Sequence, residues 1–130
     1  MMICKEIPMK LPSLNEYIAV CRCNKYKAAK FKRDIDANIA LYLRDLPQFD
    51  EPIEIHFVWI ESNRRRDYDN VASAKKFILD ALVKSGKLKD DNRKCVKGFR
   101  DSFDYGPESK VILFIKEAKL WQQQHSASEC

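Results

Sequence analysis

The chain has 130 residues, 45% of them hydrophobic and 33% charged, which fits one soluble domain and leaves too little for a second hydrophobic core. Its net charge of +5 comes from 24 basic and 19 acidic residues. No run of about 18 apolar residues is present to span a membrane, and the first residues lack the apolar stretch of a signal peptide. We therefore expect a cytoplasmic protein that does not contact a membrane.

The first half of the chain predicts a strand and a long helix. Residues 2–10 alternate enough to form a strand, and a loop through Asn15 and Tyr17 follows it. Between residues 26 and 46, apolar side chains recur at three- and four-residue spacing, as one helical face requires. Pro47 then closes this helix, because proline cannot continue one.

The second half predicts three strands and one helix. Residues 53–60 alternate at first and then become wholly apolar, as in a strand that is covered on both faces. A polar, basic loop leads to a helix over residues 70–84, and Ser85-Gly86 after it suits a helix C-cap. Residues 89–92 predict a turn, and residues 95–105 and 111–116 predict the last two strands.

The order of these elements is strand, helix, strand, helix, strand, strand. It predicts an α/β (α+β) sandwich with one domain over residues 1–120, in which a mixed sheet of about four strands packs against two main helices. Phe57 and Trp59 alternate in phase with the strand's isoleucines and are expected in the core. Residues 121–130 predict a frayed tail.

Basic residues gather in three stretches. Six lie between Arg22 and Arg33 with no acid among them, Arg64-Arg65-Arg66 is a second run, and Lys94, Lys97 and Arg100 form a third. Separated basic clusters suit a polyanion better than a small acidic ligand. The alternative for any one of them is a solvated basic surface.

Two aspartates follow the arginine run. Asp67 and Asp69 stand two residues apart, and in an extended segment their carboxylates project to one side, where they can share a hard cation. They also precede a predicted helix, whose amide dipoles favour negative charge nearby. The alternative is that these acids make only salt bridges, with Asp69 or Asn70 as an N-cap.

A third aspartate, Asp91, lies in the predicted turn after the second helix. Taken alone, Asp90-Asp91-Asn92 is typical of a simple turn. A helix of 15 residues spans roughly 22 Å, so Asp91 approaches Asp67 only if the chain returns through residues 87–92.

These motifs together resemble a known family. The stretches 64–70 (Arg-Arg-Arg-Asp-Tyr-Asp-Asn), 77–82 (Phe-Ile-Leu-Asp-Ala-Leu) and 88–91 (Leu-Lys-Asp-Asp) resemble the signature of the RusA family of crossover-junction endodeoxyribonucleases. Residues 11–17 (Leu-Pro-Ser-Leu-Asn-Glu-Tyr) are similar to that family's N-terminal motif. The resemblance implies a homodimeric hydrolase, commonly carried by prophages, that uses Mg²⁺ or Mn²⁺ to resolve Holliday junctions by paired symmetric nicks in DNA recombination and repair.

The resemblance also implies site residues. Asp67, Asp69 and Asp91 would be catalytic and bind the metal, together with a lysine of the helix. The family pattern places that lysine where Ser73 stands here, which leaves Lys75 or Lys76. Helical phase favours Lys76, since it lies four residues before Asp80.

The expected chemistry suits these residue types. Carboxylate-bound Mg²⁺ polarises a phosphodiester and lowers the pKa of the attacking water, and the lysine stabilises the developing charge. Basic side chains would bind the DNA backbone rather than read bases. The expected DNA contacts are Asn15, Lys25, Lys27, Lys30, Lys32, Arg64, Arg65 and Arg66.

Other functions stay open at this point. One is a catalytically silent module that binds four-way or other branched DNA. Another is a metal-dependent nuclease of different branched-DNA specificity. A small RNA-binding protein is a third, although no recognition motif for RNA is present.

Overall fold

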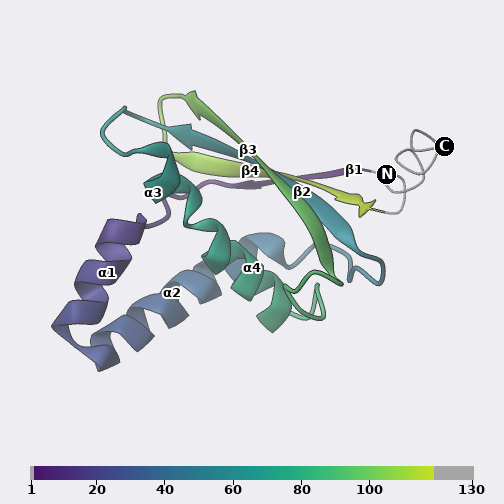
Figure 1. Cartoon of the computed structure of the whole chain (residues 1–130), viewed down its shortest axis with the longest axis horizontal. Coiled ribbons are helices and arrows are strands. Elements are labelled where there is room, and N and C mark those ends of the chain that lie inside the picture. The colour runs from purple at the N-terminus through teal and green to yellow at the C-terminus, as the bar shows by residue number, and fades with distance from the viewer. Residues whose placement is uncertain (1, 119–130) are drawn as a thin grey trace.

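The computed structural model describes residues 2–118 and shows an α+β fold, as predicted, with one mixed sheet of four strands and its helices on one side (Figure 1). The predicted tail, residues 121–130, lies outside the described residues. The elements in chain order are β1 (Met2–Ile7), α1 (Leu14–Cys23), α2 (Lys25–Leu43), β2 (Ile53–Glu61), α3 (Tyr68–Ala72), α4 (Lys75–Lys84), β3 (Val96–Tyr105) and β4 (Lys110–Glu117).

The strands lie in the order β1-β4-β2-β3. β4 pairs antiparallel with β1 and β2, whereas β2 and β3 are parallel. Parallel neighbours need a crossover connection, and α3 and α4 supply it. As a result β2 and β3 end at the same edge of the sheet, where Glu61 is paired with Tyr105.

The core lies between the sheet and the helices. Alternate β2 residues, including Phe57 and Trp59, are buried on the helix side, with exposed fractions of 0% and 3%, which confirms their predicted core position. Ile39 and Leu43 of α2 and Ile78 and Leu82 of α4 face them and are fully buried. Burial of such apolar surface is the main force that holds helices on a sheet.

One element was mispredicted. Residues 14–23 form the helix α1 instead of the loop expected through Asn15 and Tyr17. Ser13 caps this helix by accepting a hydrogen bond from the Glu16 backbone nitrogen at 3.1 Å, which is half of a capping box. Leu14, Ile18 and Cys21 recur at helical spacing in α1, but this apolar stripe is short and none of its residues is buried, so its signal is weaker than that of the longer run in α2.

The helix expected over residues 70–84 is interrupted. It begins two residues earlier, at Tyr68, and is divided into α3 and α4 at Ser73 and Ala74. The long helix expected over 26–46 corresponds to α2, with Asn24 as its N-cap. No helix in the described range is long and apolar enough to cross a membrane.

β2 was expected to be covered on both faces, and this is wrong for the described residues. The helices cover one face of the sheet, and we call the other its open face (Figure 1). On the open face, the alternate residues of β2 and β4 are only half-buried; they include Val58, Ile60, Ile112 and Phe114. An apolar sheet face left uncovered is unusual for a strand of this composition.

Candidate functional site

Asp67 and Asp69 lie at the start of α3, and we call this pair the acidic corner. Asp67 is the N-cap residue, with φ −69° and ψ 154°, and its side chain makes no capping hydrogen bond; Asp69 lies in the first helical turn. The segment is therefore helical from Tyr68 onward, which corrects the expectation of an extended Asp-x-Asp run. Both side chains are exposed, and neither forms an ion pair within residues 2–118.

Arg66, beside the acidic corner, is held by hydrogen bonds and ion pairs within the chain. Its Nε donates to Glu61 at 2.6 Å and its NH1 donates to the Leu11 carbonyl at 2.9 Å, with Glu16 at 3.7 Å. Only 15% of its side chain is exposed. Arg66 thus links the segment 11–17 to the segment 64–70. Its expected DNA contact stays a prediction, and these intramolecular contacts leave its guanidinium less available to a phosphate.

Arg64 and Arg65 are in the opposite state. Both are exposed, and in the described part of the chain neither pairs with an acid. The Arg64 guanidinium carbon lies 4.6 Å from the centroid of the Tyr105 ring. A guanidinium on an aromatic face keeps its N–H groups available for a phosphate.

Asp91 meets Lys76, not the acidic corner. The Lys76 ammonium donates to Asp91 at 2.6 Å and also contacts Asp80 at 3.2 Å. The chain therefore does return through residues 87–92 toward the start of α4, as the sequence permitted. The predicted i,i+4 pair of Lys76 and Asp80 is confirmed.

This contact belongs to a longer series of alternating charges. Lys32 joins Asp80 at 2.8 Å and Asp36 at 3.0 Å, and Lys84 reaches Asp36 at 2.6 Å. Asp36 is 5% exposed, and its Oδ1 has no hydrogen-bond partner. We call the six residues the ion-pair network: Lys32, Asp36, Lys76, Asp80, Lys84 and Asp91.

The network shifts the pKa values of its members in the directions expected for ion pairs. The hydrogen bond to Asp91, followed by that to Asp80, raises the pKa of Lys76. The hydrogen bond from Lys76 lowers the pKa of Asp91. Both shifts favour the charged forms, so the pair is ionised near neutral pH.

The three aspartates do not converge as predicted. Within the described residues, no three histidine, cysteine, aspartate or glutamate side chains lie close enough to hold a metal ion together. Asp91 instead pairs with Lys76 of α4 at 2.6 Å, whereas Asp67 and Asp69 lie at the start of the separate helix α3. Two carboxylates still suit Mg²⁺, which is often bound by one or two carboxylates together with substrate phosphates.

Lys75 points elsewhere. Its ammonium donates to Asp101 at 2.6 Å and lies 5.0 Å from the Phe99 ring and 5.5 Å from the Phe57 ring. The Lys75 side chain therefore lies against aromatic side chains of the sheet. Of the two candidate lysines, it is Lys76 that contacts one of the predicted site residues.

The remaining expected DNA contacts also divide into exposed residues without an ion pair and lysines that are paired with acids. Asn15, Lys25 and Lys27 are exposed, and the two lysines form no ion pair within the described chain. Lys30 pairs with Asp34 at 3.1 Å. Lys32 belongs to the ion-pair network, so it is less available to a phosphate than the sequence suggested.

Sequence reasoning missed two residues that shape the acidic corner. Glu61 and Glu16 hold Arg66, and Glu16 also stands at the capping position of α1. The Ser13-Leu14-Asn15-Glu16 pattern was the available signal for Glu16. Glu61 carried no signal beyond following an apolar strand.

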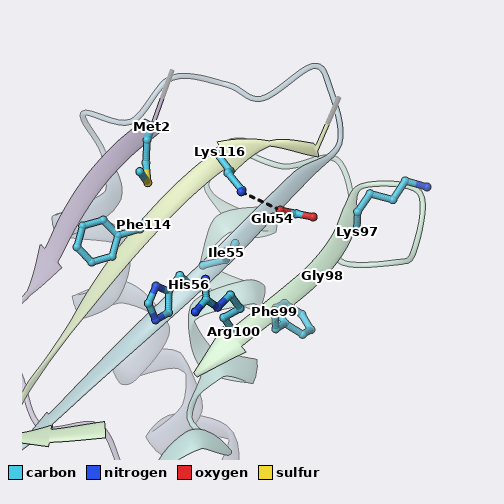
Figure 2. A pocket seen from close by; sticks show the side chains of 10 residues that line it. All are labelled: Met2, Glu54, Ile55, His56, Lys97, Gly98, Phe99, Arg100, Phe114 and Lys116. Atoms are coloured by element: carbon cyan, nitrogen blue, oxygen red, sulfur yellow. Dashed lines mark ion pairs between the residues drawn. The ribbon is translucent and has the colours of Figure 1, made fainter. Parts of the chain in front are cut away.

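A large hollow lies on the open face, away from the acidic corner. It has a volume of about 670 Å³ and includes residues of all four strands. In Figure 2 the rings of His56 and Phe114 lie on its floor, and the ion pair of Lys116 with Glu54, at 3.5 Å, lies near its rim. Lys97 and Arg100 stand on the β3 side.

Comparisons with known proteins identify no relative. No model of a known protein family matches the chain, and no curated protein matches it either. The function is therefore inferred from the residues themselves and from the motif resemblance.

Proposed function

We propose that this protein is a Mg²⁺-dependent endodeoxyribonuclease of the RusA type, which nicks four-way DNA junctions in the cytoplasm during recombination and repair. The observation that carries the proposal is the acidic corner: two exposed carboxylates without a cationic partner in the described chain, next to two unpaired arginines. Arg66 links this corner to residues 11–17, so two segments of the family-like pattern meet there.

The residues divide the work as follows. Mg²⁺, or Mn²⁺ in its place, would polarise the phosphodiester and lower the pKa of the attacking water. Asp67 and Asp69 would hold the ion, and Arg64 and Arg65 would hold the flanking phosphates. Lys76 would stabilise negative charge on the reacting phosphate, with Asp91 orienting its ammonium.

The test is a nicking assay on a labelled four-way junction, with and without Mg²⁺. We expect paired symmetric nicks with Mg²⁺, and an Asp69→Asn rate lower by on the order of a hundredfold or more, with junction binding retained. Asp34→Asn is the matched control, because Asp34 is an exposed aspartate of α2 paired only with Lys30. Normal cutting by Asp69→Asn would end the proposal.

Two other functions are separated by the same assay. A silent junction-binding module would bind the junction and leave it uncut with Mg²⁺. A nuclease of other specificity would prefer flaps or single-strand branches, so these substrates are compared with the junction and with plain duplex.

We also propose that the enzyme is a homodimer that packs through the open face of the sheet. The face presents half-buried apolar side chains, including Val58 and Ile112, and Met2 is 62% exposed. Two of its lysines pair with glutamates, Lys110 at 2.7 Å and Lys116 at 3.5 Å. Such an apolar surface suits a second copy better than DNA, and a two-fold dimer matches the near-two-fold junction.

Sedimentation velocity tests the dimer at micromolar concentration. Ile112→Asp should give a folded monomer, whereas Leu41→Asp, at a 61% exposed leucine of α2, should leave the dimer intact. A monomeric unmodified protein that still makes paired symmetric nicks would contradict the dimer.

A further inference from the structure

A cluster of aromatic side chains and one arginine borders the acidic corner. Tyr68 begins α3, between the two aspartates of the corner. Phe103 and Tyr105 lie at the end of β3, and Arg64 comes from the loop after β2. We call these four residues the aromatic platform.

The platform is a consequence of the parallel pairing of β2 and β3. Phe103 is paired with Trp59 and Tyr105 with Glu61, so the carboxyl ends of the two strands lie side by side. A hydrogen bond of 3.0 Å from the Gly106 nitrogen to the Glu61 carbonyl closes this edge. Arg64, in the loop that leaves β2, lies against Tyr105 at the end of β3.

Its rings are stacked. The Tyr68 ring lies on the Phe103 ring with a centroid distance of 4.1 Å and an angle of 10° between the planes. The Arg64 guanidinium lies on the Tyr105 ring. Hydrogen bonding with the Tyr68 side chain raises the pKa of the Tyr105 phenol.

Unlike the core aromatics, the platform faces water. Tyr68 is 55% exposed and Tyr105 41% exposed. One face of the Tyr68 ring lies against Phe103, and more than half of the residue is still exposed, which is the surface that a further flat ring would use. Offset stacking is the preferred arrangement for such rings.

We propose that the aromatic platform is a stacking subsite for an unpaired nucleobase of the DNA strand that enters the acidic corner, an inference that rests on the proposed function. An unpaired base continues the Phe103–Tyr68 stack, which works for any base because every base has a π-face. Arg64 holds an adjacent phosphate through two N–H groups. The subsite favours branched DNA in which a base at the branch is unpaired, since intact duplex offers no such base.

The experiment measures binding without divalent ions, so that it does not depend on cutting. Two branched DNAs are compared: one has a short single-stranded gap at the branch, and the other has abasic sites in that gap. We expect the protein to bind the first about tenfold more tightly, from the stacking of one base. Tyr68→Leu should bring this ratio to about one, and Tyr68→Phe should keep most of it.

Two variants complete the design. Tyr26→Leu, at a 77% exposed tyrosine of α2, should leave the ratio unchanged. Arg64→Gln should weaken binding to both DNAs equally, because it removes a phosphate contact. A folded Tyr68→Leu protein that keeps the wild-type ratio would overturn the subsite and show that the stack only closes the end of the sheet.

The failure of this inference is distinguishable from failure of the proposed function. A preference for the base-containing gap without any nicking in Mg²⁺ supports the subsite and contradicts the nuclease. Nicking in Mg²⁺ with no preference for the base-containing gap supports the nuclease and contradicts the subsite.

Discussion

The acidic corner and the ion-pair network contain the same kinds of side chain in opposite states. In the network each aspartate is held by a lysine, and Asp36 is almost fully buried. In the acidic corner Asp67 and Asp69 are exposed, and no basic residue within 2–118 pairs with either. Charges that are neutralised inside the chain contribute to folding, whereas unbalanced charges stay available to a ligand.

The arginine run shows the same contrast over three consecutive residues. Arg66 is held by Glu61 and the Leu11 carbonyl, whereas Arg64 and Arg65 face solvent without an acidic partner in the described structure. A like-charged run in a sequence can therefore hold one structural residue and two binding residues. The predictions below test whether this division is real.

Lys76 belongs to the network and is also proposed to act on the phosphate, so its substitution should have the largest effect. We expect Lys76→Ala to lower the nicking rate at saturating junction by on the order of a hundredfold, with binding retained. Lys75→Ala is the control and should have a mild effect, because Lys75 contacts Asp101 instead. Equal nicking rates for Lys76→Ala and the unmodified protein would show that Lys76 does not act on the phosphate and belongs only to the ion-pair network.

The second prediction concerns stability. Asp36→Ala should lower the free energy of unfolding by about 1–3 kcal/mol, since it removes buried hydrogen bonds to charged groups. Asp67→Ala should change it by about 0.5 kcal/mol or less, as for an exposed residue without partners. Urea unfolding gives both values, and similar losses in the two variants would contradict the comparison.

The third prediction uses salt dependence to separate the arginines. Arg64→Gln and Arg65→Gln should each reduce the slope of log K for junction binding against log salt by about 1, since each loses a phosphate contact. Arg66→Gln should leave the slope nearly unchanged and instead lower the urea midpoint. A slope change confined to Arg66→Gln would reverse the assignment.

The smallest effect is on the titration of Lys76. Asp91→Asn should lower the pKa of Lys76 toward its ordinary value, because Asp91 is the main cause of the raised pKa. NMR of ¹³C-labelled lysine measures this shift, and Asp34→Asn serves as the control. An unchanged Lys76 titration in Asp91→Asn would show that the two side chains are apart in solution.

The pKa directions also fix the pH range of this pair. The pKa of Lys76 is raised on folding, so its stabilisation is present below the ordinary lysine pKa of about 10.4 and is lost as pH rises through the raised value. The pKa of Asp91 is lowered, so its stabilisation is present above about 3.9 and is lost as pH falls through the lowered value. The contact is therefore intact across the neutral range.

The amino-acid sequence by itself determined the elements with a strong apolar period and several local contacts. α2, β2, β3 and β4 were located within a few residues, because their buried faces repeat at helical or strand spacing. The pair of Lys76 and Asp80 followed from i,i+4 spacing on one helix. α1 was missed although Leu14, Ile18 and Cys21 recur at helical spacing and Ser13 supplies an N-cap, since this apolar run is short.

Only the tertiary structure decided which charges are paired. Asp91 and Lys76 are 15 residues apart, Lys84 and Asp36 are 48 apart, and Arg66 reaches the Leu11 carbonyl across 55 residues. Such contacts depend on how the crossover between two parallel strands folds back, which no local period encodes. The sequence therefore located the acidic and basic residues, and long-range packing selected the ones that remain free to bind.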